Sequence, residues 1–450
     1  MARSEGWALT LLVVIGLILL LWAKWHRPSP ATPRAHSNAK LTPRPLTPRP
    51  PDDCPACRGS QPICSPSSTA PKPYTQVKSP RGRKKRIATA GYACPNPNCL
   101  YYGITDDQIH ALVGYGGHGR QEYIRDLKCQ ACLTKCSARY GTVLYRLKTP
   151  SRRVGEVLSA LAEGLSVGAA VRVFGHGEFT IRSWLTRAGL HAASLHERLF
   201  QNLNLLHIQL DELCTKTRQG ADALWVWFAV DARTKIIAVL KVGPRTQPMA
   251  HAVLHALVKV LAQDCLPVFT SDGLKLYFYA LTAHFGNWVE TIDRKTRVWQ
   301  VRADLLYGQL TKHYRRRRLV RIERRALLGS LDQLTTALRR RGESGTIQTA
   351  FVERLNPTVR QAVTALTRRT WGIAQSSAEL MLHLEWWRAY YHFTRPHMSL
   401  SEPLAAPRLR GGKRLPQRFR SRTPAQVVGV ADHRWTIVEL LSYPLPKPVG

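Results

Sequence analysis

Three acidic residues stand where a catalytic metal could bind. Asp211 and Asp272 each end a mostly apolar run of the kind that forms a buried strand. Glu353 lies among apolar residues, and Arg360 follows it by two helical turns on the same face. A carboxylate that points inward costs free energy unless it binds a cation. Because Mg²⁺ prefers carboxylate oxygens, the three acids predict a metal site that acts on phosphodiesters.

The stretch around the glutamate also resembles a known family. Residues 351–356 read Phe-Val-Glu-Arg-Leu-Asn, and Arg360 and the pair Arg368-Arg369 follow. This pattern is similar to the glutamate helix of DDE transposases, above all to that of the insertion-sequence-one family and its relatives. The resemblance covers residues 93–440, which is nearly everything except the N-terminal segment 1–92.

The resemblance implies a two-metal mechanism. Asp211 would bridge two Mg²⁺ or Mn²⁺ ions, Asp272 and Glu353 would each complete one side, and Arg360 would contact a substrate phosphate. A metal-bound water would be the first nucleophile, and the freed DNA 3′-hydroxyl would then attack target DNA.

Four other acids compete for these roles. Glu212 neighbours Asp211 but should point to the other side of its strand, and Asp231 suits a turn. Glu290 and Glu323 could replace the glutamate on spacing alone, although neither has the surrounding motif. Taken singly, any of these acids is an ordinary strand-end or surface carboxylate.

The elements that must position the acids follow a familiar order. A first strand is predicted at 205–213, followed by a hairpin of two strands at 223–231 and 235–243. A helix at 246–263 and a further strand at 267–272 come next. This is the order of an α/β ribonuclease-H-like core, a mixed sheet with flanking helices, which we place at 203–400. In that fold the strands of Asp211 and Asp272 are neighbours.

Two features depart from the family pattern. A basic stretch at 291–345, which includes Arg315-Arg-Arg-Arg318, separates the second acid from the third. We interpret it as an insertion that grips the DNA backbone; a solvated charge run is the alternative. Pro357 follows Glu353 within the expected helix, where proline could kink it and leave the copy inactive.

Paired cysteines predict a zinc-binding module at 93–150. Cys94 and Cys99 form one pair, and Cys129 and Cys132 form the other, separated by a glycine-rich stretch that we expect to be a loop. Four thiolates at such spacing are typical of a structural zinc site without an open position for catalysis. Cys136 and His118 are substitute ligands, and four unliganded thiols are the alternative. The family resemblance also implies an N-terminal zinc finger.

Residues 151–202 predict a helix-turn-helix. Apolar spacing favours helices at 151–163, 167–174 and 179–190, with Ser151 capping the first. The third would pack Trp184 and Leu185 inward. It would present these residues to a major groove: Thr180, Arg182, Ser183 and Arg187. An ordinary three-helix spacer is the alternative.

The two ends of the chain carry no visible chemistry. Residues 1–25 include an apolar run at 7–23 that could be a transmembrane helix, and its basic flank would place the following domains in the cytoplasm. An upstream start or fused fragment is the bland alternative. Residues 26–92 are a Pro- and Arg-rich stretch predicted to be a disordered linker. Residues 401–450 form a basic tail.

The composition favours a nucleic-acid partner. Lys plus Arg number 66 against 29 Asp plus Glu, which gives a net charge of +37. Such a field attracts polyanions, although a ribosomal or membrane-surface protein could be as basic. We predict an insertion-sequence transposase that acts as a homodimer or higher oligomer on transposon ends and target DNA. It would work at the nucleoid, with the apolar run as an inner-membrane tether. An inactive, membrane-tethered DNA-binding relative is the alternative.

Overall fold

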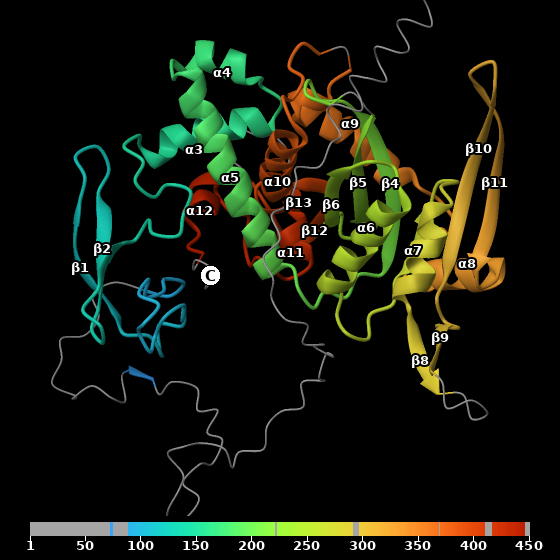
Figure 1. Ribbon diagram of the computed structural model, residues 1–450, viewed down its shortest axis with the longest axis horizontal. Helices are drawn as coiled ribbons and strands as arrows, with labels where there is room; N and C mark the ends of the chain where they lie inside the picture. Colours follow the sequence, from blue (N-terminus) through green and yellow to red (C-terminus); the bar gives the residue numbers. More distant parts are fainter. Residues whose placement is uncertain are drawn as a thin grey trace, which may run out of the picture. The chain divides into compact units, whose positions relative to one another are not determined.

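The computed structural model describes residues 73–74, 89–220, 223–290, 297–368, 370–409 and 416–445 (Figure 1). The chain divides after Ser68 into two units, and every described residue belongs to the second. The expected transmembrane segment 7–23 and most of the expected linker therefore lie outside the described residues. Within the described ranges, no helix is both long and apolar enough to cross a bilayer.

A six-stranded mixed sheet forms the centre of the described unit, in the order β11-β10-β7-β4-β5-β6. Its strands are β4 (His207–Thr215), β5 (Leu224–Asp231), β6 (Ile237–Gly243), β7 (Val268–Ser271), β10 (Tyr307–Arg315) and β11 (Arg318–Leu328). The first three form an antiparallel meander, whereas β7 is parallel to both β4 and β10. The mixed α/β arrangement is consistent with the expected ribonuclease-H-like core.

Helices cover both faces of this sheet because its central strands are apolar on both sides. The covering helices are α6 (Gln247–Val260), α7 (Leu276–His284), α8 (Leu331–Arg340), α9 (Ala350–Ala362) and α10 (Ser377–Phe393), with the short η3 (Thr364–Leu366) after α9. Along β4, Ile208 and Leu210 pack in the cluster that contains α6 and α7. Leu213 packs instead with α9 and α10. This period-two alternation makes β4 the strand that both layers share.

Part of the basic stretch 291–345 is not an insertion, because it forms two strands of the central sheet. Tyr307 to Gln309 pair in parallel with β7, and β11 closes the sheet edge. The first residues of β10 are buried, and Leu310 packs on α8. The surrounding arginines mask the short apolar run in the sequence, so our interpretation of the whole stretch as an insertion is corrected for these strands.

The three helices before the core are α3 (Ser151–Ala162), α4 (Val167–Phe174) and α5 (Glu178–Leu199). The last runs beyond the expected end at 190, because Ala192 and Leu195 remain buried in the core. Ser166 caps α4 by accepting a hydrogen bond from the N–H of Ala169. Ser151 does not cap α3 as expected; its N–H and hydroxyl donate to Glu122 of the preceding module.

The preceding module contains a three-stranded antiparallel sheet of β1 (Leu112–His118), β2 (Ile124–Cys129) and β3 (Lys135–Ser137). The glycine-rich stretch that we expected to be a loop is largely β1. A register shift between Gly114 and Gly116 accommodates its glycines in the strand. Gly119 follows in the turn with φ of 107°.

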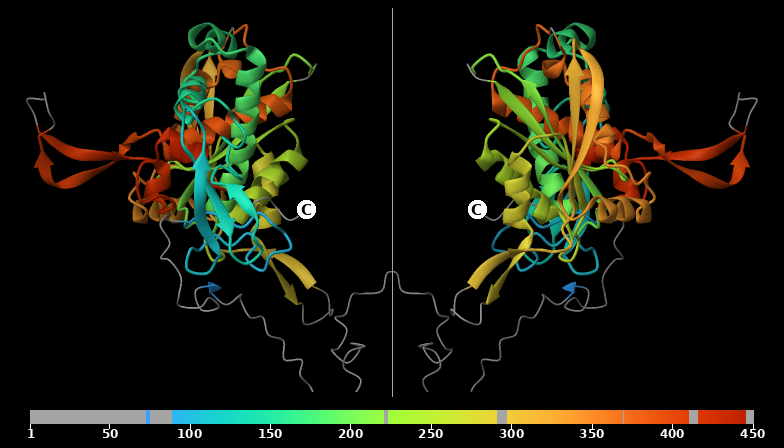
Figure 2. Two further views of the ribbon diagram at one scale, coloured as in Figure 1. Left: turned by 90° about the vertical axis from the view of Figure 1, so that its left-hand side faces the viewer. Right: turned by 90° about the vertical axis from the view of Figure 1, so that its right-hand side faces the viewer.

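Two further ribbons and two short helices complete the described unit. They are β8 (Gly286–Glu290) with β9 (Arg297–Val301), β12 (His397–Arg408) with β13 (Gln417–Arg422), α11 (Pro424–Val427) and α12 (Ile437–Ser442). Figure 2 shows the β12–β13 ribbon extending away from the helices. Beyond it, the ring of Trp435 stacks on Phe393 with centroids 4.3 Å apart, so the basic tail packs on α10.

Candidate active site

Asp211 lies in the middle of β4 and is held by two donors. Its Oδ2 accepts from Nδ2 of Asn356 at 2.7 Å, and its Oδ1 accepts from the N–H of Glu212 at 2.9 Å. Burial, together with the charges of Asp272 and Glu212, raises the pKa of Asp211 to about 7, although the Asn356 bond acts the other way. A bound cation would relieve this penalty, because an opposite charge favours the ionised form.

Asp272 directly follows β7 and adjoins Asp211. The parallel register pairs Leu210 with Ser271, so the two aspartates take the next positions on neighbouring strands. Such strands lie about 4.8 Å apart. Oδ1 of Asp272 accepts from the N–H of Leu274 at 3.1 Å, which fixes the turn. The structure thus brings together the first two acids, as the sequence predicts.

Glu353 lies in the first turn of α9, which Gln209 fastens to β4. Gln209 Oε1 accepts from the N–H groups of Phe351 and Val352, and its Nε2 donates to the carbonyl of Gln348. A side chain from β4 therefore caps the N-terminal N–H groups of α9, which have no partner within the helix. Because Gln209 is two residues before Asp211, it sets α9 over the first acid.

Both oxygens of Glu353 have partners within the protein. Oε2 accepts from Nζ of Lys312 at 2.5 Å, and Oε1 accepts from the hydroxyl of Thr349 at 2.6 Å. A group of three or more possible metal ligands whose ligand atoms all lie within 4.8 Å of one another occurs once among the described residues, and it consists of cysteines. Glu353 therefore lies on the helix expected from the sequence, but its carboxylate is turned toward Lys312.

The donors at this place suit a hard divalent cation. A half-buried carboxylate with a raised pKa adjoins a second carboxylate, and a third lies on the covering helix. In addition, Oδ1 of Asn356 is buried and has no hydrogen-bond partner in the described part. Carboxylate and amide oxygens are the ligands that Mg²⁺ and Mn²⁺ accept, so Asp211, Asp272 and Glu353 fit such an ion.

The competing acids have other partners. Glu212 binds Arg245 and the hydroxyl of Tyr277 on the opposite side of β4, as expected. Asp231 accepts from the main-chain N–H of His207, at the start of β4, and from that of Thr234 in the β5–β6 turn. The other two acids form exposed ion pairs within their ribbons: Glu290 with Arg297, and Glu323 with Arg325.

A comparison with protein families bears on this same region. A family model described as the integrase core domain matches residues 340–402, which include all of α9, with Glu353, and all of α10. The match supports an integrase- or transposase-type DDE catalytic domain. It also implies a DNA substrate and the use of divalent metals such as Mg²⁺. No curated protein matches the chain.

Two residues of the matched segment answer expectations from the sequence. Helix α9 continues through Pro357, so the proline does not break it. Its cost is local, because the carbonyl of Glu353 receives no N–H from position 357. The guanidinium of Arg360 donates to the carbonyls of Leu366 at 3.0 Å and Cys214 at 3.3 Å. Its contact with a substrate phosphate stays a prediction.

Sequence reasoning missed three residues of the site. A glutamine within an apolar strand, two positions before an acid, was a usable signal for Gln209. Asn356 was also detectable, because it lies three residues after Glu353 on the same helical face. Lys312 was not, since only the sheet order brings β10 beside α9.

The raised pKa of Asp211 makes a stability prediction. The folded state holds this proton more tightly than the unfolded chain, so the free energy of unfolding falls as pH rises from about 4 to about 7. Asp211→Asn removes that penalty and should be more stable than the wild type at pH 8. The pKa displacement sets a ceiling of roughly 4 kcal/mol on the gain, which partial exposure reduces.

Urea unfolding of both proteins at pH 4 and pH 8, without divalent metal other than zinc, measures this gain. We expect nearly equal stabilities at pH 4, where both side chains are neutral. An equal difference at the two pH values would refute a titration effect.

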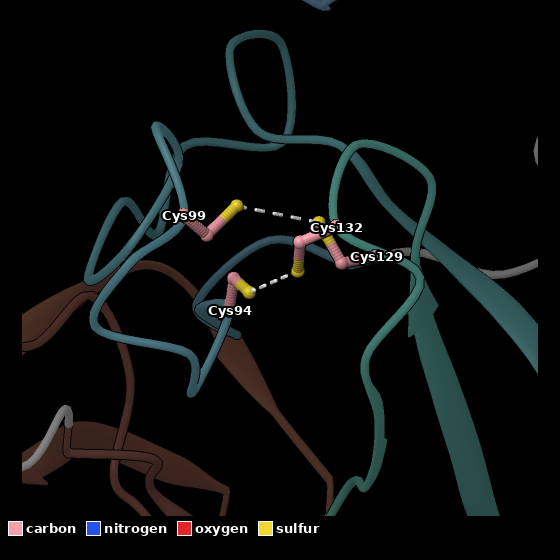
Figure 3. Close-up of side chains that lie close together, drawn as sticks. All are labelled: Cys94, Cys99, Cys129 and Cys132. Carbon is pink, nitrogen blue, oxygen red and sulfur yellow. Dashed lines mark hydrogen bonds between the residues drawn. The ribbon is translucent and has the colours of Figure 1, made fainter.

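The four predicted zinc ligands converge. The Sγ atoms of Cys94 and Cys132 lie 3.5 Å apart, and those of Cys99 and Cys129 lie 3.8 Å apart (Figure 3). Sulfurs on one tetrahedral zinc would be about 3.8 Å apart, given a Zn–S bond of about 2.3 Å. The arrangement is compatible with structural zinc.

The substitute zinc ligands stand apart from this set. Nδ1 of His118 instead donates to the carboxylate of Asp126 at 3.1 Å, and Cys136 is not part of the group.

The expected DNA-reading helix has internal partners. Trp184 and Leu185 of α5 are buried, as predicted. Arg182 forms ion pairs with Glu178 and Glu379, while Arg187 donates to the carbonyl of Tyr145. Thr180 and Ser183 are partly exposed. Base contacts by these four residues stay predictions, and DNA would have to compete with the acidic partners of Arg182.

The four consecutive arginines form the tip of the β10–β11 hairpin. Arg316 and Arg317 take left-handed φ angles of 49° and 65°, and Arg315 pairs with Arg318 across the turn. Two left-handed residues in succession are typical of a two-residue hairpin turn, although without glycine they cost about 1 kcal/mol or more each. All four side chains are exposed.

Proposed function

We propose that the chain is an insertion-sequence transposase that cuts and joins DNA by a two-metal DDE mechanism. The observation that carries the proposal is the placement of Asp211 and Asp272 side by side, with Glu353 on a helix that is docked against the same strand. The integrase-core match over that helix supports the same class of reaction.

The proposed mechanism gives each residue a role. Bound divalent ions would supply Lewis acidity at the scissile phosphate and lower the pKa of an attacking water. Asp211, Asp272 and Glu353 would hold the ions. Asn356 orients the Asp211 carboxylate, and Gln209 keeps α9 at the correct height on β4.

The remaining modules would deliver DNA to this site. We propose that the four cysteines hold structural zinc, and that α4 and α5 read the ends of the element. Because transposition joins two ends, a homodimer or higher oligomer on DNA in the cytoplasm is the working assembly. Arg315 to Arg318 would contact the DNA backbone.

The experiment that tests this function is cleavage of the element's own terminal DNA by the full-length chain. Strand nicking that requires Mg²⁺ or Mn²⁺ supports the transposase. Zinc-dependent DNA binding without nicking in either metal would instead support the inactive relative. The continuity of α9 through Pro357 removes one reason for that second interpretation.

The arginine turn makes a separate prediction. Arg316→Asn with Arg317→Gly suits a two-residue hairpin turn, so it should keep the hairpin while removing two cationic contacts. Each lost phosphate contact lowers the slope of log affinity against log salt by about 0.9. We expect the slope for duplex binding to fall by roughly 1.8.

A matched control for the arginine turn removes two arginines that already have acidic partners. Arg297→Gln with Arg302→Gln takes the same charge from ion pairs with Glu290 and Asp304. Fluorescence anisotropy over a salt series compares the variants. Equal slopes for both double variants would contradict a specific role of the turn.

A further inference from the structure

One cation inside the protein is bonded to the proposed metal ligand of α9. Nζ of Lys312 lies 2.5 Å from Oε2 of Glu353, and the Thr349 hydroxyl donates a hydrogen bond to the other carboxylate oxygen, Oε1. An inner-sphere divalent ion on Glu353 would stand beside this ammonium and be repelled by it. Lys312 and a metal ion therefore compete for one carboxylate.

Lys312 belongs to an arm that leaves the sheet next to the proposed site. The pairing of β10 with β7 ends at Gln309, opposite Ser271, one residue before Asp272. From Thr311 to Glu323, the chain pairs only with itself, as a two-stranded hairpin (Figure 1). We call residues 311–323 the arm. Lys312 lies at its root.

The charges of the arm favour a polyanion. Its basic side chains are Lys312, the four arginines of the turn and Arg321, whereas Glu323 is its one acid and is already paired with Arg325. DNA that contacts the turn would pass over the arm toward its root. A phosphate near the root would offer Lys312 a second anionic partner.

The exposure of the ion pair allows this exchange. The Lys312 and Glu353 side chains are 29% and 40% exposed. Such pairs contribute little to stability, and the lysine carries its charge on a flexible four-carbon stem. A fully buried pair would resist separation, whereas this one can open when a better anion arrives.

We propose that Lys312 competes with the catalytic metal for Glu353. DNA bound to the arm would draw Lys312 away from Glu353, so that DNA and metal bind cooperatively. This inference rests on the proposed function, because it assumes that Glu353 is a metal ligand. By linkage, the factor by which DNA tightens metal binding equals the factor by which metal tightens DNA binding.

Titration of the zinc-loaded, full-length protein with Mn²⁺, followed by electron paramagnetic resonance, tests the competition without DNA or activity. Lys312→Gln should bind Mn²⁺ roughly 10-fold more tightly than the wild type, which lies within the usual range of coupling between two sites. Lys312→Arg keeps the charge and should stay near the wild-type affinity.

Arg354→Gln is the matched control for the Mn²⁺ titration. It removes one positive charge from the residue next to Glu353, but its side chain makes no hydrogen bond with Glu353 in the described part. We expect a change of less than about twofold. If Lys312→Gln gains no more affinity than Arg354→Gln, the inference is wrong.

Asp272→Asn separates failure of this inference from failure of the proposed function. Weakened Mn²⁺ binding in this variant supports the carboxylate site, whatever Lys312 does. Unchanged binding would overturn the site, and the competition with it.

The reciprocal measurement is the affinity for a labelled non-specific duplex with and without Mn²⁺. The metal should tighten DNA binding by the wild type more than by Lys312→Gln, because only the wild type must first release Glu353. Equal tightening in both proteins would contradict the cooperative step.

Discussion

Replacing Asp211, Asp272 or Glu353 by its amide should lower the rate of metal-dependent strand cleavage by roughly 10³-fold, which corresponds to about 4 kcal/mol of transition-state stabilisation. Each amide keeps the size of the side chain but removes the charge that holds a divalent ion. The pairing of Leu210 with Ser271 places the two aspartates side by side. Each would hold the ions from its own position, so one aspartate cannot take over the role of the other. Cleavage of labelled terminal DNA over a range of Mg²⁺ and Mn²⁺ concentrations measures the loss.

Glu290→Gln and Glu323→Gln are the matched controls for these substitutions. Both acids lie between Asp272 and Glu353 in the sequence and were rival candidates for the third ligand. Both form ion pairs on exposed ribbons, where loss of a pair costs about 1 kcal/mol or less. We expect near wild-type cleavage. Full activity of Glu353→Gln together with an inactive Glu323→Gln would move the third ligand to the arm.

DNA binding should survive the three substitutions, since none of the acids is expected to contact the element ends. A variant that neither binds nor cleaves would therefore report a folding defect rather than a catalytic one. Circular dichroism distinguishes the two cases.

The first strands of the core were largely predictable, because apolar runs that reach an acid leave a strong pattern. Asp272 directly follows β7, whereas β4 continues past Asp211 to Thr215, and the adjacency of the two strands was expected from the ribonuclease-H-like order. The glutamate helix was found through its motif instead, since a single acid on an amphipathic helix is common.

The failures have a physical reason in common. Each arises where tertiary contacts outweigh a local signal. The apolar start of β10 is short and surrounded by arginines, so charge dominated its interpretation. Ser151 has the side chain of a helix cap, yet Glu122 offers it a charged acceptor. Lys312 carries no local signal at all, because its partner lies 41 residues away.

The module that contains the four cysteines should depend on bound zinc for stability, because its own core is small. The buried cluster of this module contains Cys94, Cys99, Tyr101, Ala111, Leu112, Leu127 and Cys129. Three of these seven side chains are predicted ligands, so few apolar groups remain to hold the fold without zinc. Where a metal site forms only in the folded state, the free energy of metal binding is also free energy of folding.

Cys129→Ser should therefore abolish stoichiometric zinc binding and unfold the module. Cys136→Ser is the matched control, because this thiol lies on β3 of the same sheet but outside the group of four. We expect one zinc per chain in the wild type and in Cys136→Ser, and none in Cys129→Ser. Metal analysis after dialysis measures the content. Equal zinc loss in both variants would make Cys136 a ligand, and unchanged zinc in Cys129→Ser would refute the site.

Loss of zinc should also affect the following helix, α3. Glu122, between β1 and β2, accepts from the N–H and hydroxyl of Ser151 and pairs with Arg139. Unfolding of the module removes this acceptor from the first turn of α3, whose N-terminus has no other side-chain cap. Hydrogen exchange in residues 151–154 should therefore accelerate in Cys129→Ser but not in Cys136→Ser. Unchanged protection there would show that the module and α3 are independent, and that zinc serves the module alone.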